Sequence, residues 1–88
     1  MHVEIYTKEK CPFCHRAKML LKDWNIQFVE HQLGVDFTRE MLLEKFSTAK
    51  TYPVIVVDGF FIGGFEELNK MINESTENGS MLLNERSE

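Results

Sequence analysis

The sequence contains few cysteines and prolines and no long apolar run. Two cysteines and two prolines occur among its 88 residues, which excludes a scaffold held together by several disulfides. The longest apolar stretch, residues 52–57, is far shorter than the roughly 18 residues of a membrane helix. Residues 1–10 lack the apolar segment of a signal peptide. We therefore expect a cytoplasmic protein with no membrane association, in which a cysteine pair is more often catalytic or metal-binding than structural.

The composition is that of one small globular domain. An apolar fraction of 43% and a charged fraction of 27% are typical of a folded protein. At this length we expect a single domain over residues 1–88. Because the apolar pattern fades after Asn73, we expect its core to span about residues 2–74, with a C-terminal tail at 75–88.

The net charge of −4 hides a basic segment, since residues 8–22 carry five lysines and arginines and one glutamate. The chain has no basic stripe beyond this segment, so we do not expect it to bind nucleic acid. Lys8 and Lys10 shortly precede Cys11, where they would lower the thiol pKa and attract small anions. For Lys18 and Lys22, a solvated helix face explains the charge as well as a role beside the thiol does.

Apolar spacing predicts a strand, a helix and a second strand in the first third of the chain. Residues 2–6 and residues 26–31 alternate as strands do. Between them, a helix that starts at Pro12 and ends near residue 24 is predicted by apolar residues at spacings of three and four: Cys14, Ala17, Leu21 and Trp24. Such a unit implies a parallel strand pair with a right-handed crossover.

The remaining chain adds a helix, a hairpin and a third helix. The second helix is predicted over residues 38–46, with Asp36 or Thr38 as its N-cap. The β-branched run at residues 54–57 does not alternate, which favours a central strand buried on both faces. An Asp-Gly pair then predicts a tight hairpin to residues 60–62. A helix after the Gly-Gly pair completes the order β-α-β-α-β-β-α.

The two cysteines lie two residues apart at the start of the first predicted helix. This spacing lets two sulfurs meet across one helical turn and is typical of a redox-active dithiol. Cys11 lies at the helix edge, where unpaired N–H groups stabilise a thiolate, and Cys14 lies on the apolar stripe. We therefore interpret Cys11 as the nucleophile and Cys14 as the resolving thiol of a thiol–disulfide oxidoreductase.

Two metal readings of the cysteine motif fit less well. Cys-Pro-Phe-Cys-His also matches the c-type haem attachment pattern, but that reading needs export and a second axial ligand. Zinc as a rule needs four ligands, which would be Cys11, Cys14 and two of His2, His15 and His31. Their spacing matches no zinc finger, so no metal site is expected.

Four segments resemble glutaredoxins. Residues 3–18 contain a strand, a lysine and Cys-Pro-Phe-Cys, where the family has Cys-Pro-Tyr-Cys. Thr51-Tyr52-Pro53 is similar to the family's Thr-Val-Pro with its cis-proline. Val-Asp-Gly at residues 57–59 precedes the last strand, and residues 62–68 are similar to Gly-Gly-x-Asp-Asp-Leu. The chain thus resembles dithiol glutaredoxins. Its residues 34–46 resemble glutaredoxins that phages encode.

The resemblance implies an α/β thioredoxin fold, with a four-stranded mixed sheet flanked by three helices, in a monomer. It also implies a glutathione-binding groove, with glutathione as co-substrate and no tightly bound cofactor. The implied glutathione-binding residues are Lys8, Phe13, Arg39, Thr51, Tyr52, Pro53, Gly64, Phe65 and Glu66. The sequence departs from the family pattern at four positions: Phe13 replaces Tyr, Tyr52 replaces Val, and Glu66 and Glu67 each replace Asp.

The implied function is a glutathione-dependent oxidoreductase that reduces protein disulfides or mixed glutathione disulfides. One alternative is a dedicated electron donor to ribonucleotide reductase, itself reduced by a thioredoxin-reductase-like enzyme. Another, from a different class, is a metal or iron–sulfur carrier. Relatives that share a cluster between subunits usually have Gly or Ser where this chain has Pro12, which makes the carrier the weakest of the three readings.

Overall fold

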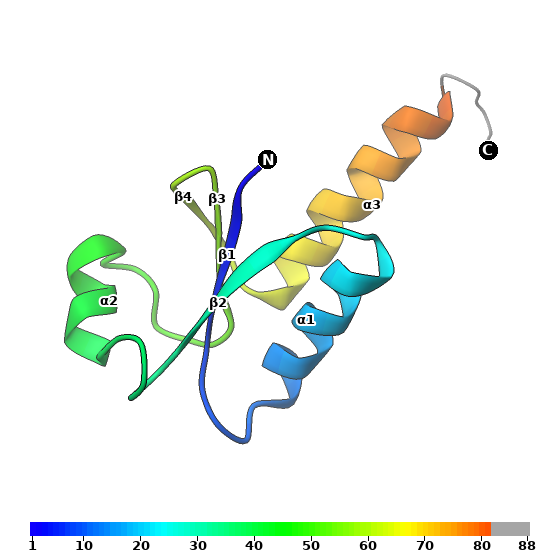
Figure 1. The fold of residues 1–88 in the computed structure, drawn as a ribbon. Coiled ribbons are helices and arrows are strands. Elements are labelled where there is room, and N and C mark those ends of the chain that lie inside the picture. Colours follow the sequence, from blue (N-terminus) through cyan, green and yellow to red (C-terminus); the bar gives the residue numbers. More distant parts are fainter. Residues whose placement is uncertain (82–88) are drawn as a thin grey trace.

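The computed structural model describes the backbone of residues 1–81 and the side chains of residues 1–74. Its elements follow the expected order and lie close to the expected bounds (Figure 1). They are β1 (Val3–Thr7), α1 (Pro12–Asp23), β2 (Phe28–Gln32), α2 (Arg39–Lys45), β3 (Val54–Val57), β4 (Phe60–Gly63) and α3 (Phe65–Met81). No helix in this part of the chain is long and apolar enough to cross a membrane.

The four strands form one mixed sheet in the order β2-β1-β3-β4. β1 pairs with β2 in parallel, as the strand–helix–strand unit requires, and β3 pairs antiparallel with both β1 and β4. The prediction of a doubly buried central strand is confirmed, because Val54, Ile55 and Val56 are at most 1% exposed. The Asp-Gly hairpin is confirmed as well. Asp58 and Gly59 both have positive φ, 52° and 86°, as a tight turn between twisted strands demands.

The helices cover both faces of the sheet. Figure 1 shows α1 and α3 side by side on one face and α2 on the other. The first layer buries one apolar cluster, formed by Val3, Ile5, Ala17, Leu21, Ile55, Leu68 and Ile72. The second layer buries another, formed by Tyr6, Phe37, Leu42, Ala49, Val54 and Val56. The expected sheet with three flanking helices is therefore present.

Three details differ from or refine the expectations. Trp24, predicted on the apolar stripe, is 45% exposed because the helix ends before it. Asn25 adopts a positive φ of 57° and turns the chain away. Thr38 caps α2 by accepting the Met41 N–H at 3.2 Å, so the structure selects Thr38 over Asp36. α3 continues to Met81, past the end of the apolar pattern.

Leu21 tests whether α1 is held by its buried stripe. Its side chain is 0% exposed, so Leu21→Ala should lower the free energy of unfolding by about 2–5 kcal/mol. The matched control on the same helix is Met19→Ala, at a position that is 43% exposed; its effect should stay near 0.5 kcal/mol, about the size of surface substitutions. Urea unfolding followed by circular dichroism measures both. Equal losses in the two variants would contradict this packing.

Candidate active site

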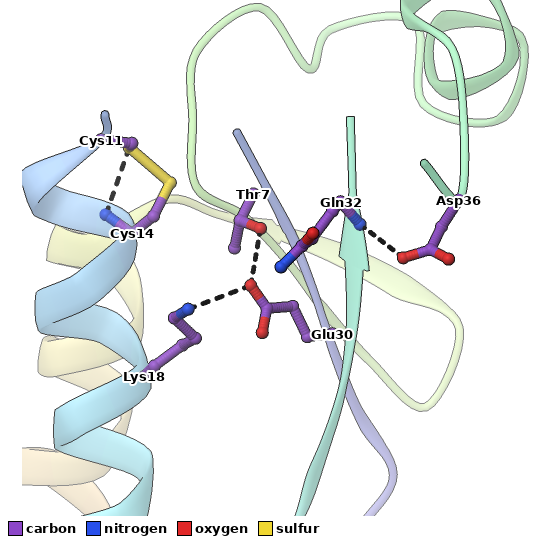
Figure 2. A network of polar contacts seen from close by, with 7 residues as sticks. All are labelled: Thr7, Cys11, Cys14, Lys18, Glu30, Gln32 and Asp36. Atoms are coloured by element: carbon purple, nitrogen blue, oxygen red, sulfur yellow. Dashed lines mark hydrogen bonds and ion pairs between the residues drawn. A yellow bond between two sulfur atoms is a disulfide. The ribbon is translucent and has the colours of Figure 1, made fainter. Parts of the chain in front are cut away.

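The two cysteines form a disulfide at the start of α1 (Figure 2). Their Cα atoms lie 5.2 Å apart, within the range that a disulfide spans. β1 ends at Thr7, and a short loop leads to Cys11, the N-cap of α1, whose backbone is extended. Lys10, in that loop, has a positive φ of 56°. Pro12 occupies the first helical turn, where its missing N–H leaves no bond unmade.

The environments of the two sulfurs differ, as the position of the apolar stripe predicts. Cys14 is 2% exposed, whereas Cys11 is partly exposed. The Cys14 N–H donates to the Cys11 Sγ at 3.2 Å. This contact places the outer sulfur at the N-cap, where it takes a helix N–H that has no intrahelical partner. The chain therefore has one sulfur at the helix edge and one packed inside the fold.

A hollow of about 330 Å³, here called the cysteine hollow, opens between α1 and the ends of β1 and β2. Its lining residues are Thr7, Lys8, Glu9, Lys10, Cys11, Cys14, His15, Lys18, Glu30, Gln32, Leu33 and Val35. It brings both cysteines together with Lys8 and Lys10, as the charge pattern predicts. The hollow is thus mostly polar and rich in cations.

A polar network that the sequence analysis did not identify lies inside the cysteine hollow. Figure 2 shows Lys18 and Thr7 pointing toward the same carboxylate. The Lys18 Nζ and the Thr7 Oγ1 donate to Glu30 Oε2 at 3.0 and 2.8 Å. Burial alone would raise the pKa of Glu30, but these hydrogen bonds and the Lys18 charge outweigh it and lower the pKa below its ordinary value of 4.5. Lys18 is therefore part of an ion pair and not a purely solvated residue.

A second hollow of about 220 Å³, here called the aromatic groove, contains most of the residues expected to bind glutathione. It is lined by Phe13, Thr51, Tyr52, Gly64, Phe65, Glu66 and Glu67. The Phe13 and Phe65 rings lie 5.9 Å apart. The Arg16 guanidinium lies over both rings, 5.6 and 6.0 Å from their centroids. The start of α1, the loop before β3 and the start of α3, which are distant in sequence, therefore meet along this groove.

Tyr52 lines the groove and also contacts the loop that precedes Cys11. The Lys8 Nζ lies 5.6 Å from the centroid of the Tyr52 ring, so Lys8 lines the cysteine hollow and also contacts a residue of the groove. The peptide bond between Tyr52 and Pro53 is cis, as the resemblance implies. Pro53 also borders the groove closely, because a Cβ on Gly64 would lie 3.2 Å from the Pro53 carbonyl oxygen.

The start of α3 is capped by its own carboxylate, a feature that the sequence analysis missed. Glu67 Oε1 accepts the Gly64 N–H at 2.8 Å. The hydrogen bonds from the Gly64 and Glu67 N–H groups lower the pKa of this carboxyl. Its side chain folds over Gly63, where an added Cβ would lie 2.5 Å from Glu67 Cγ and where φ is +133°. A glutamate three residues after the cap is the signal of a capping box.

Arg39 is not placed with the other candidates. It is exposed at the first position of α2, and it lines neither the cysteine hollow nor the aromatic groove. Two of the three histidines contact Glu4 instead of the cysteines, at 3.0 Å for His31 and 3.5 Å for His2. Among the side chains of residues 1–74, no group of three or more His, Cys, Asp and Glu residues could hold a metal ion.

A redox disulfide at the first helix of a four-stranded mixed sheet defines a thiol–disulfide oxidoreductase of the thioredoxin fold. Solved structures support this class. Glutaredoxin 1 from Francisella tularensis has a TM-score of 0.70 and 30% identity, covering 85% of this chain and 95% of that one. The Escherichia coli glutaredoxin structure has a TM-score of 0.68 and 27% identity, covering 85% and 96%.

Sequence comparison identifies the family within this class. The Glutaredoxin family model matches residues 3–62. Glutaredoxin 3 of Escherichia coli (strain K12) is 42% identical over 67 residues, which cover 76% of this chain and 81% of that protein. A glutaredoxin-like 8.6 kDa protein of Clostridium pasteurianum is 34% identical over 74 residues, covering 82% and 99%. The chain therefore belongs to the glutaredoxin family and is a thiol–disulfide oxidoreductase.

The lowered pKa of Glu30 predicts how the stability of the fold depends on pH. Because this pKa is lower in the folded chain than in the unfolded one, ionised Glu30 stabilises the fold above about pH 4.5. That stabilisation disappears as the pH falls through the folded pKa. The difference in free energy of unfolding between the native chain and Glu30→Gln should therefore be largest near neutral pH and shrink in acid. Urea titrations at about pH 7 and pH 3 measure it, with exposed Glu44→Gln as control. A difference independent of pH would contradict the assignment.

Proposed function

We propose that this chain uses glutathione to reduce protein disulfides or mixed glutathione disulfides through Cys11 and Cys14. The observation that carries the proposal is the unequal placement of the two sulfurs. Cys11 Sγ lies at the N-cap, 3.2 Å from the Cys14 N–H, while Cys14 is 2% exposed. Only the outer sulfur is accessible to an incoming disulfide, and it is the one that the helix N-terminus stabilises as a thiolate.

The reaction begins with the Cys11 thiolate in the reduced protein. It attacks one sulfur of the substrate disulfide, forms a mixed disulfide and releases the other sulfur as a thiolate. A glutathione thiolate or Cys14 then displaces the bound group. Lys8 and Lys10, which line the hollow around Cys11, add positive charge to the helix N-terminus. A moderately lowered pKa of Cys11 serves this chemistry best, because nucleophilicity falls as the thiol pKa falls.

The aromatic groove is the proposed glutathione site. It is lined by Phe13, Thr51, Tyr52 and the start of α3, which are among the residues that the resemblance implies for glutathione. The Tyr52 backbone would pair with the tripeptide as an added strand. N–H groups in the first turn of α3, at Phe65 and Glu66, would receive the γ-glutamyl carboxylate.

One charged side chain in the groove and one beside it would orient the tripeptide. Glu66 is exposed at the groove and would meet the γ-glutamyl ammonium. Lys8, whose ammonium lies over the Tyr52 ring, would meet the glycine carboxylate at the end nearer the cysteines. Arg39 lies outside both hollows and would act only on a ligand that extends beyond the groove. A reducing compartment such as the cytoplasm would keep glutathione and the dithiol in their reduced forms.

The cysteine roles are tested by substituting each cysteine in turn. Cys11→Ser should abolish reduction of a glutathione mixed disulfide, because it removes the attacking sulfur. Cys14→Ser should retain part of the activity, since glutathione can resolve the mixed disulfide without it. Turnover is followed with glutathione, glutathione reductase and NADPH. Retained activity in Cys11→Ser would contradict the roles. Efficient reduction by thioredoxin reductase without glutathione turnover would favour the dedicated electron donor instead.

Glu66 tests the location of the glutathione site. Glu66→Gln should raise KM for a glutathione mixed disulfide about two- to fivefold with little change in kcat, because an exposed ion pair contributes at most about 1 kcal/mol. The control is Glu74→Gln, an exposed glutamate on the same helix outside the groove. A KM that rises equally in both variants would show that overall charge, and not the groove, is responsible.

A further inference from the structure

The proposed reaction leaves the Lys18–Glu30 pair without a role, although it shares the cysteine hollow with both thiols. Lys18 follows Cys14 by four residues on α1, so the two side chains are neighbours on one face of the helix. Helical side chains lean toward the N-terminus, which directs the Lys18 stem toward Cys14. Both residues line the same 330 Å³ hollow. The Lys18 ammonium is therefore held on the side of α1 that buries the second thiol.

Glu30 holds that ammonium from the sheet. It accepts from Lys18 at 3.0 Å and from Thr7 at 2.8 Å, so α1, β1 and β2 all meet at one carboxylate. The two charged side chains are 28% and 24% exposed, which leaves them only partly screened by water. The pair adds no net charge to the hollow. Other charged or titratable side chains that line the hollow come from the loop and the helix start: Lys8, Glu9, Lys10 and His15.

We propose that Glu30 neutralises Lys18 so that Cys14 stays a protonated thiol and glutathione, more than Cys14, resolves the mixed disulfide on Cys11. Lys18 and Glu30 are then positioning residues that act through the second thiol. Without Glu30, the Lys18 charge would favour the Cys14 thiolate. Without Lys18, the Glu30 charge would disfavour it. The ion pair thereby sets the balance between two routes out of one intermediate.

The two routes differ in what attacks and what leaves, and this part rests on the proposed function. In the first route, a glutathione thiolate attacks the glutathione sulfur of the mixed disulfide. Glutathione disulfide forms and the Cys11 thiolate is released. In the second route, Cys14 loses its proton to solvent and its thiolate attacks Cys11 Sγ. The Cys11–Cys14 disulfide forms, and glutathione leaves as a thiolate that takes up a proton. Only the second route needs an ionised Cys14.

The test measures the proton affinity of Cys14 directly. In a Cys11→Ser background Cys14 is the one remaining thiol, and its ionisation is followed by thiolate absorbance at 240 nm. Adding Glu30→Gln should lower its pKa and adding Lys18→Met should raise it, each by about one unit, the low end of the effect of a nearby charge. The double variant, which removes both charges, should return close to the starting value.

A purely structural pair gives a different pattern. Loss of packing would move both single variants in the same direction and the double variant further. Lys22→Met is the matched control, because this exposed lysine lies one helical turn beyond Lys18 and should leave the Cys14 pKa unchanged. Unchanged values, shifts of the same sign, or an equal shift in Lys22→Met would each overturn the proposal. If Lys18→Met does not fold, the Cys14 pKa in Glu30→Gln decides alone: a lower value supports the proposal, and an unchanged or higher value overturns it.

The consequence for the reaction is measured in the chain with both cysteines. During turnover of a glutathione mixed disulfide, Glu30→Gln should accumulate severalfold more Cys11–Cys14 disulfide than the native chain. Acid quenching and mass spectrometry of the intact protein quantify it. An unchanged disulfide fraction would overturn the proposed control of the two routes. The thiol titration needs no glutathione, so a failure of the proposed function would appear only in the turnover assay.

Discussion

The packing of one stripe of α1 against the sheet determines where the chemistry takes place. Cys14, Ala17 and Leu21 are at most 2% exposed, and Ala17 and Leu21 share a core cluster with Ile5 on β1. This burial fixes the rotation of the helix about its axis. Because Cys14 is part of the stripe, Cys11, three residues earlier, must lie at the helix edge beyond it. The contrast between the two thiols therefore follows from core packing.

Electrostatics then acts on a geometry that packing has already set. The outer sulfur receives a helix N–H and lies in a loop with Lys8 and Lys10, an arrangement that favours an anion. The inner sulfur is buried, since Cys14 is 2% exposed, and it lines the same hollow as an ion pair with no net charge. Burial in addition disfavours a charged thiolate. Two cysteines only three positions apart can thus have very different affinities for a proton.

Local patterns were sufficient to predict the elements and much of the site. The Asp-Gly hairpin, the β-branched central strand and the cysteine spacing each depend on residues close in sequence, and the structure contains all three. The Thr7–Glu30 contact was not predictable in this way, since it joins residues 23 positions apart. It depends on the register of two parallel strands, which hydrophobic alternation alone does not fix. The predicted place of Trp24 on the buried stripe is wrong for another reason. Apolar spacing does not reveal where a helix ends.

The departures from the family pattern at Phe13 and Tyr52 are explained by what each side chain contacts. Phe13 packs on Phe65 and under Arg16 through its ring, contacts that need no hydroxyl. Tyr52 fills more space than Val, and its ring stacks on Phe37, 6.4 Å away, in the cluster beneath α2. Its hydroxyl is buried and has no hydrogen-bond partner among the described residues, so the ring provides the contact. Tyr52 thereby anchors one wall of the groove in the core on the α2 face, while Phe13 and Phe65 anchor the other wall to α1 and α3.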